Sequence, residues 1–210
     1  MAELWIPDPA ERDDLGAFVA RAARLDRDAI VRLRDGDGRV HAWVDTPFDA
    51  LVTRSVRGAV RPGDTTVSSA DLLAAVAVVG TAVSDPGRAQ DALWRCTLPP
   101  EQGWYAVDQV PAGVLADLTD QGAAVARHNP GPNGSPPAAL LDQKVITVSG
   151  AGLEVGVPLR CLFALSGMGF VGTLGTSETV RVSATDSWLR LDARYGAVLR
   201  RRHALLPLLV

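Results

Sequence analysis

Alternating apolar and polar residues near both ends of the chain constrain its fold more than any other feature of the sequence. The first alternation covers 30–34 and 39–44, and the second covers 180–183 and 188–194. A repeat of two residues is typical of a β-strand that buries one face and exposes the other. The tetrapeptide Asp35-Gly36-Asp37-Gly38 separates the first two runs and favours a tight hairpin turn. Each end of the chain is therefore predicted to form an antiparallel sheet.

Helices are predicted between these strands by capping residues and by apolar residues at helical spacing. Asp8, Pro9 and Glu11 predict the start of a helix, as N-cap, first helical residue and capping-box partner. Further helices are expected at 70–79, 111–127 and 158–165, and further strands at 51–57, 93–98, 104–108, 144–148, 153–157 and 197–201. The predicted fold class is α+β, with two modules that are each an antiparallel β-meander with packed helices.

A segment rich in proline and glycine, 129–137, is the clearest candidate for a linker in the sequence. It predicts an N-terminal α+β module over 1–128 and a C-terminal α+β module over 138–210. The same composition also suits a long loop inside one domain, so both interpretations stay open.

Composition limits the expected partners and compartment. The chain has 210 residues and a formal net charge of −3, which is too small to predict a nucleic-acid or membrane partner. Lys144 is the only lysine among its 21 cationic residues, which indicates a codon bias toward arginine. Cys96 and Cys161 follow a start without a basic and apolar leader, so the reducing cytoplasm is the expected location. No apolar run reaches the roughly 20 residues that a membrane span needs.

Motifs that resemble cofactor or metal sites lack the context that such sites require. The hexapeptide Gly167-Met168-Gly169-Phe170-Val171-Gly172 matches a dinucleotide-binding pattern, but too few residues follow it for the crossover helix. His41, His128 and His203 stand alone, whereas zinc sites need closely spaced ligand pairs. No catalytic, cofactor-binding or metal-ligating residue is predicted, which favours a non-enzymatic role but leaves open whether the chain is an enzyme.

The polar faces of the two predicted meanders carry the only repeated set of side chains with binding chemistry. This candidate binding face consists of Arg32, Arg34, Arg39, Trp43, Arg181, Trp188, Arg190 and Arg194. A guanidinium can pair with phosphate or carboxylate, and a tryptophan ring can stack on a base or on an arginine. Two other interpretations stay open. The face is merely solvated, or Trp43 and Trp188 pack under a helix or between the modules.

Several motifs along the chain resemble those of a family of uncharacterised actinobacterial proteins with a two-part layout. The motifs are PAALLDQKVITVS at 137–149, VPLR at 157–160, MGF at 168–170, WLRLD at 188–192 and YG at 195–196. The resemblance implies a cytoplasmic actinobacterial protein of unknown role. The motifs carry no known chemistry, so the resemblance assigns no functional residue.

The preferred hypothesis is a non-enzymatic cytoplasmic protein that binds another protein or acts as a scaffold. Its partner is expected to be a second protein or another copy of the chain, and the apolar tail 204–210 offers a contact surface. One alternative is nucleic-acid binding through the Arg/Trp faces, which the acidic balance of the chain disfavours. The other is an enzyme whose site is assembled from residues far apart in the sequence.

Overall fold

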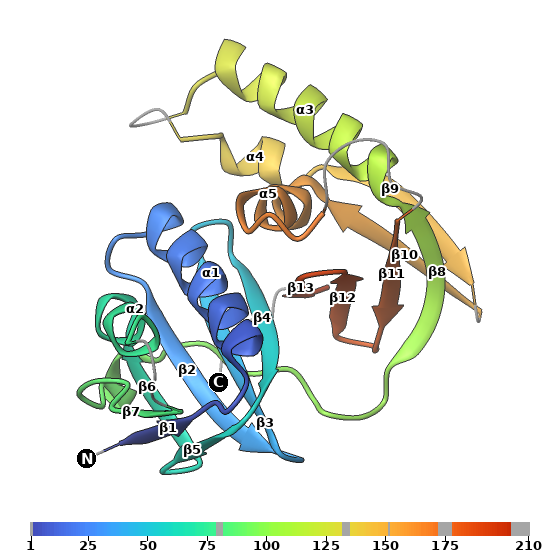
Figure 1. Cartoon of the computed structure of the whole chain (residues 1–210). Coiled ribbons are helices and arrows are strands. Elements are labelled where there is room, and N and C mark those ends of the chain that lie inside the picture. The colour runs from blue at the N-terminus through green and yellow to red at the C-terminus, as the bar shows by residue number, and fades with distance from the viewer. Residues whose placement is uncertain (1, 79–81, 132–134, 151, 172–177, 203–210) are drawn as a thin grey trace, which may run out of the picture. The chain divides into compact units, whose positions relative to one another are not determined.

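The computed structural model describes residues 2–78, 82–131, 135–150, 152–171 and 178–202, and it divides into two compact units (Figure 1). The first unit is Met1–Thr97 with Gly167–Gly169, and the second is Leu98–Ser166 with Phe170–Val210. Each unit combines helices with antiparallel strands, so the predicted α+β class with two parts is confirmed.

The first unit carries a larger sheet, a smaller sheet and packed helices. Its elements are β1 (Glu3–Trp5), α1 (Pro9–Leu25), β2 (Ile30–Gly36), β3 (Arg39–Thr46), β4 (Ala50–Arg57), β5 (Ala59–Arg61), β6 (Asp64–Ser68), α2 (Ser69–Val76), β7 (Val83–Ser84) and the 3-10 helix η1 (Asp91–Leu93). The strand order of the larger sheet is β6-β2-β3-β4, and its neighbouring strands are antiparallel. In the smaller sheet, β1 lies between β5 and β7.

Helix α1 begins as its sequence predicts and packs on the larger sheet. Asp8 accepts a hydrogen bond from the Ala10 amide at 2.9 Å, and Pro9 is the first helical residue. Helix α1 contacts α2, β3 and β4. The buried residues of this core include Leu15, Phe18, Val19 and Ala22 of the helix and Val31, Leu33, Val40, Ala42 and Val44 of the sheet. Burial of each large apolar side chain stabilises the fold by about 1.5–3 kcal/mol. The alternate buried residues of β2 and β3 therefore contribute much of the stability of this unit.

The second unit contains a larger sheet, a separate hairpin and further helices. Its elements are β8 (Tyr105–Pro111), α3 (Ala112–His128), α4 (Ala138–Leu141), β9 (Lys144–Gly150), β10 (Leu153–Pro158), α5 (Leu159–Gly167), β11 (Thr179–Ala184), β12 (Trp188–Ala193) and β13 (Gly196–Arg201). Its larger sheet has the order β13-β12-β11-β8, again with antiparallel neighbours. The antiparallel hairpin of β9 and β10 passes close to β8 (Figure 1).

Helix α5 is buried along most of its length, and one of its buried residues is charged. Pro158 precedes the helix, and the next seven residues, 159–165, are all buried or nearly so. Arg160 is only 7% exposed, and its Nε and Nη2 donate to Oδ1 of Asp142 at 2.9 and 2.6 Å. Because a buried guanidinium is costly without a counter-charge, Asp142 is what permits arginine at this position.

The strand predicted at 93–98 is wrong, whereas the other predicted strands and helices occur within a few residues of their expected bounds. Asp91–Leu93 forms η1, and residues 94–98 belong to no strand. The segment does not add to the sheet as a strand because the backbone groups of Thr66 in β6, the edge strand, already have other partners. The Thr66 amide donates to Asp91 Oδ1 at 2.6 Å, and the Thr66 carbonyl accepts from the Gln90 amide at 2.7 Å. These bonds occupy the groups that an added strand would need.

The segment 129–137 lies within the second unit and connects α3 to α4. The Gly131 amide donates to the Ser135 carbonyl at 2.8 Å, which closes the base of this connection. The module boundary expected at this segment stays a prediction. His203, the apolar tail 204–210 and Gly172 of the glycine motif lie outside the described residues.

Candidate functional site

Half of the candidate binding face lies on the polar side of the first unit's larger sheet. Arg32 Nε and Nη2 donate to the two carboxylate oxygens of Asp64, both at 2.7 Å, and Arg34 Nε lies 3.5 Å from the same carboxylate. Trp43 is half-buried directly opposite Arg32 in the strand register. Arg39 lies farther along and donates to the side chain and carbonyl of Ser55 at 2.7 and 2.9 Å. The guanidiniums of this face therefore already have partners.

Trp94 covers part of this face, which the sequence did not indicate. The Arg32 guanidinium lies 5.6 Å from the centre of the Trp94 ring, within the range of a cation–π contact. Arg32 also donates to the Asp64 carboxylate, and this hydrogen bond is the largest cause that raises the Arg32 pKa. The contact of Trp94 was not predicted because it depends on the position of η1 and not on the alternation of residues along a strand.

The other half of the face lies on the second unit's larger sheet and is also paired. Asp192 accepts from Arg190 at 2.8 Å and lies 3.7 Å from Arg181, while Arg194 donates to Glu178 at 2.6 Å. The Arg190 guanidinium lies 5.8 Å from the centre of the Trp104 ring. This face thus repeats the first one: one carboxylate between two arginines, and one tryptophan over an arginine.

Trp188 is part of the packing rather than of an open surface. Only 6% of Trp188 is exposed, and the Arg201 guanidinium lies 5.0 Å from the centre of its ring. Of the two tryptophans predicted for the binding face, Trp43 is thus half-buried and Trp188 buried. The structure places the eight predicted residues in two groups, one on each unit, and the function of each group stays a prediction.

An exposed apolar surface occurs on the smaller sheet of the first unit, where no site was predicted. Trp5 is 45% exposed and stands opposite Ala59 on one side and Val83 on the other, and Val83 is itself 44% exposed. Glu3 and Arg61 are also directly opposite each other, and with Trp5 and Ala59 they line a groove of about 350 Å³. We call Trp5, Ala59 and Val83, with Glu3 and Arg61, the Trp5 surface. A large exposed tryptophan with a charged rim is typical of protein interfaces.

The two cysteines of the chain are free, and Cys96 is paired with a carboxylate. The Cys96 pKa is raised from 9.0 to about 12. The largest cause is burial of the thiol, and the next is its hydrogen bond with Asp45. Desolvation also raises the Asp45 pKa, which the bond from Cys96 partly offsets. Cys161 is fully buried in α5.

We expect Cys96 to react slowly with iodoacetamide at about pH 9, because the thiolate is the reactive form. Asp45→Asn should speed the reaction by removing the negative charge, and mass spectrometry of the modified peptide measures the rate. Since the folded chain keeps this proton between pH 9 and about 12, its stability should fall as the pH rises through that range. Equal rates for the native chain and the denatured chain would contradict the pairing.

Within the described part of the chain, no group of three or more His, Cys, Asp or Glu side chains could hold a metal ion. No helix in those same residues is long and apolar enough to cross a membrane.

Solved DNA polymerase sliding clamps have a fold similar to that of this chain. The Caulobacter crescentus clamp matches with a TM-score of 0.60 at 15% identity, over 98% of this chain and 66% of the clamp chain. The Bacillus subtilis clamp matches with a TM-score of 0.59 at 14% identity, over 99% of this chain and 66% of the clamp chain. The Pseudomonas aeruginosa clamp gives 0.58 at 11% identity, over 99% and 66%. At such identities the likeness shows the fold alone, and the chain spans 66% of the length of these clamps.

Family comparisons divide the chain where its two units meet in the sequence. No curated protein matches it. Residues 1–96 match the domain of unknown function DUF8010, and residues 99–205 match the domain of unknown function DUF8185. The predicted two-part family of unknown function is thereby confirmed. The chain belongs to the DUF8185 family, whose model covers its second part, and carries a DUF8010 match in its first part.

Proposed function

We propose that this protein is a non-enzymatic, protein-binding scaffold of the cytoplasm. The observation that carries the proposal is the sliding-clamp fold, which accounts for 98% of the chain at a TM-score of 0.60. The solved proteins with this fold are described as DNA polymerase sliding clamps, and that description links them to another protein, the polymerase. Free cysteines support the cytoplasmic location.

The Trp5 surface is the part of the first unit best suited to receive a partner. Tryptophan is enriched among the residues that dominate binding energy, and its exposure here leaves a large apolar area in water. Glu3 and Arg61 at the rim can orient a partner through charge without burying an unpaired ion.

Nucleic-acid binding through the Arg/Trp faces is the less favoured hypothesis. Arg32 and Arg34 share Asp64, and Arg190 and Arg181 share Asp192, so a phosphate would have to displace a carboxylate at each place. The net charge of −3 also opposes a long-range attraction to polyanions.

Trp5→Ala should weaken capture of the partner from a lysate of the source organism. Loss of a central tryptophan costs about 2 kcal/mol or more at an interface, which is roughly thirtyfold in affinity. The measurement is the amount of stoichiometric partner retained by immobilised wild-type and variant chains. Tyr105→Ala is the matched control, because Tyr105 is 57% exposed on β8 of the second unit.

The same assay separates the hypotheses. If capture disappears after nuclease treatment, the Arg/Trp faces and nucleic acid replace the scaffold proposal. If neither a foreign protein nor a second copy of the chain is retained at stoichiometric level under gentle conditions, the scaffold proposal fails.

A further inference from the structure

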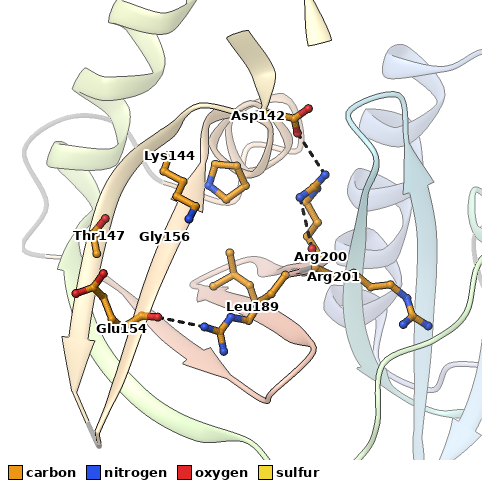
Figure 2. A pocket seen from close by; sticks show the side chains of 10 residues that line it. Asp142, Lys144, Thr147, Glu154, Gly156, Leu189, Arg200 and Arg201 are labelled. Carbon is orange, nitrogen blue, oxygen red and sulfur yellow. Dashed lines mark hydrogen bonds and ion pairs between the residues drawn. The ribbon is translucent and has the colours of Figure 1, made fainter. Parts of the chain in front are cut away.

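A polar pocket of about 290 Å³ lies in the second unit between the β9–β10 hairpin and strands β12 and β13 (Figure 2). Its lining includes the cations Lys144, Arg200, Arg201 and Arg202 and the carboxylates Asp142 and Glu154. A surplus of cations in one pocket is notable in a chain whose net charge is −3.

Asp142 does not neutralise the pocket, because two guanidiniums already share it. Arg160 Nη2 lies 2.6 Å and Arg200 Nη2 lies 3.4 Å from Asp142 Oδ1. Figure 2 shows Arg200 reaching along the pocket toward Asp142. One carboxylate between two guanidiniums leaves this wall of the pocket with a positive charge.

Neutral acceptors fix the Arg202 guanidinium. Its Nη1 donates to the Thr185 carbonyl at 2.9 Å, and its Nη2 donates to the Glu154 carbonyl at 3.1 Å. Carbonyls orient the guanidinium without cancelling its charge, and a guanidinium has five N–H donors, so further donors remain for a ligand. Such preorganisation lowers the entropic cost of binding an anion.

Gly156 positions Lys144 in the pocket. A Cβ atom at Gly156 would lie 2.5 Å from Lys144 Cδ, so the lysine side chain lies directly over the glycine backbone. Figure 2 shows Lys144 across the strand that carries Gly156. Among the described residues, no carboxylate forms an ion pair with Lys144. Its ammonium is thus available for a ligand, and three N–H donors make it a strong binder of oxyanions.

We propose that this pocket binds a small molecule through an oxyanion group, either a phosphate or a carboxylate. Both groups accept charge-assisted hydrogen bonds from Lys144 and Arg202. The pocket lies at the small end of the range for ligand sites, which favours a compact anion. This site is independent of the scaffold proposal and of the Trp5 surface.

Calorimetric titration at constant ionic strength, with pyrophosphate, inorganic phosphate and citrate as separate probes, tests the site. We expect saturable binding of one anion per chain. Lys144→Gln should weaken it about tenfold, because one charge-assisted bond is lost. Gly156→Ala should weaken it in the same direction while keeping every charge, because the new methyl group displaces the Lys144 side chain.

Arg127→Gln is the control, since Arg127 is an exposed cation at the end of α3 and does not line the pocket. Preference for the phosphates over citrate, or the reverse, identifies the oxyanion, and either supports the site. The absence of saturable binding for all three probes would overturn the proposal. So would an equal loss of affinity in Lys144→Gln and Arg127→Gln.

Discussion

Gly150→Ala is expected to lower the free energy of unfolding by about 3 kcal/mol. A Cβ atom at Gly150 would overlap the backbone carbonyl oxygen of Val107 in β8, and a backbone atom cannot rotate away. The β9–β10 hairpin would have to separate from β8 at this point. Urea unfolding followed by circular dichroism measures the change.

Gly113→Ala is the matched control for this effect. Gly113 lies in the first turn of α3, and apart from its chain neighbours and the backbone of its own helix no described atom lies within 4 Å of the position its Cβ would take. Alanine favours a helix over glycine by about 0.5–1 kcal/mol, so this variant should be slightly more stable than the wild type. If both variants unfold at the same urea concentration, the close approach of β8 and β9 is not what requires glycine at position 150.

Gly58→Ala should have a comparable effect in the first unit, about 3 kcal/mol, from two causes. The φ angle of Gly58 is +154°, which is unfavourable for residues with a Cβ, and that Cβ would overlap the Trp5 carbonyl oxygen. Because β1 pairs with β5 directly after Gly58, the substitution should displace β1 and with it the Trp5 surface. The variant should therefore lose both stability and capture of the partner.

Gly63→Ala separates these causes from a general effect of replacing a turn glycine. Its Cβ would meet only the Asp35 side chain, at 3.7 Å, which is an ordinary contact. We expect wild-type stability and capture for Gly63→Ala. A Gly58→Ala chain that keeps wild-type capture despite its lower stability would argue that the partner binds elsewhere.

Local patterns were enough to predict the long elements. Period-two alternation and the Asp-Gly turn predicted β2 and β3, and Asp8 with Pro9 predicted the start of α1. Each of these signals lies within one continuous stretch of sequence. The outward face of β2 was also predicted correctly, because Arg32 and Arg34 alternate with buried Val31 and Leu33.

The short elements and the surfaces depend on contacts between distant residues. Strand β1 has three residues, and its partners are Arg61, Val60 and Ala59 on one side and Ser84 and Val83 on the other. Three residues are too few for an alternation of apolar and polar residues to predict such a strand. The run Arg200–Arg202 is too short to be recognised as a basic patch in the sequence. In the structure, Lys144 of β9 lines the same pocket, and the carbonyl of Glu154 in β10, 48 residues away in the sequence, accepts a hydrogen bond from Arg202.

The pairing of two arginines with one aspartate makes the charge of each polar sheet face sensitive to a single position. Asp64 serves Arg32 and Arg34, and Asp192 serves Arg181 and Arg190. A change of either aspartate to asparagine would remove the carboxylate that two guanidiniums share and would raise the charge of that face by one unit. A single substitution at position 64 or 192 would therefore make that face more attractive to an anion.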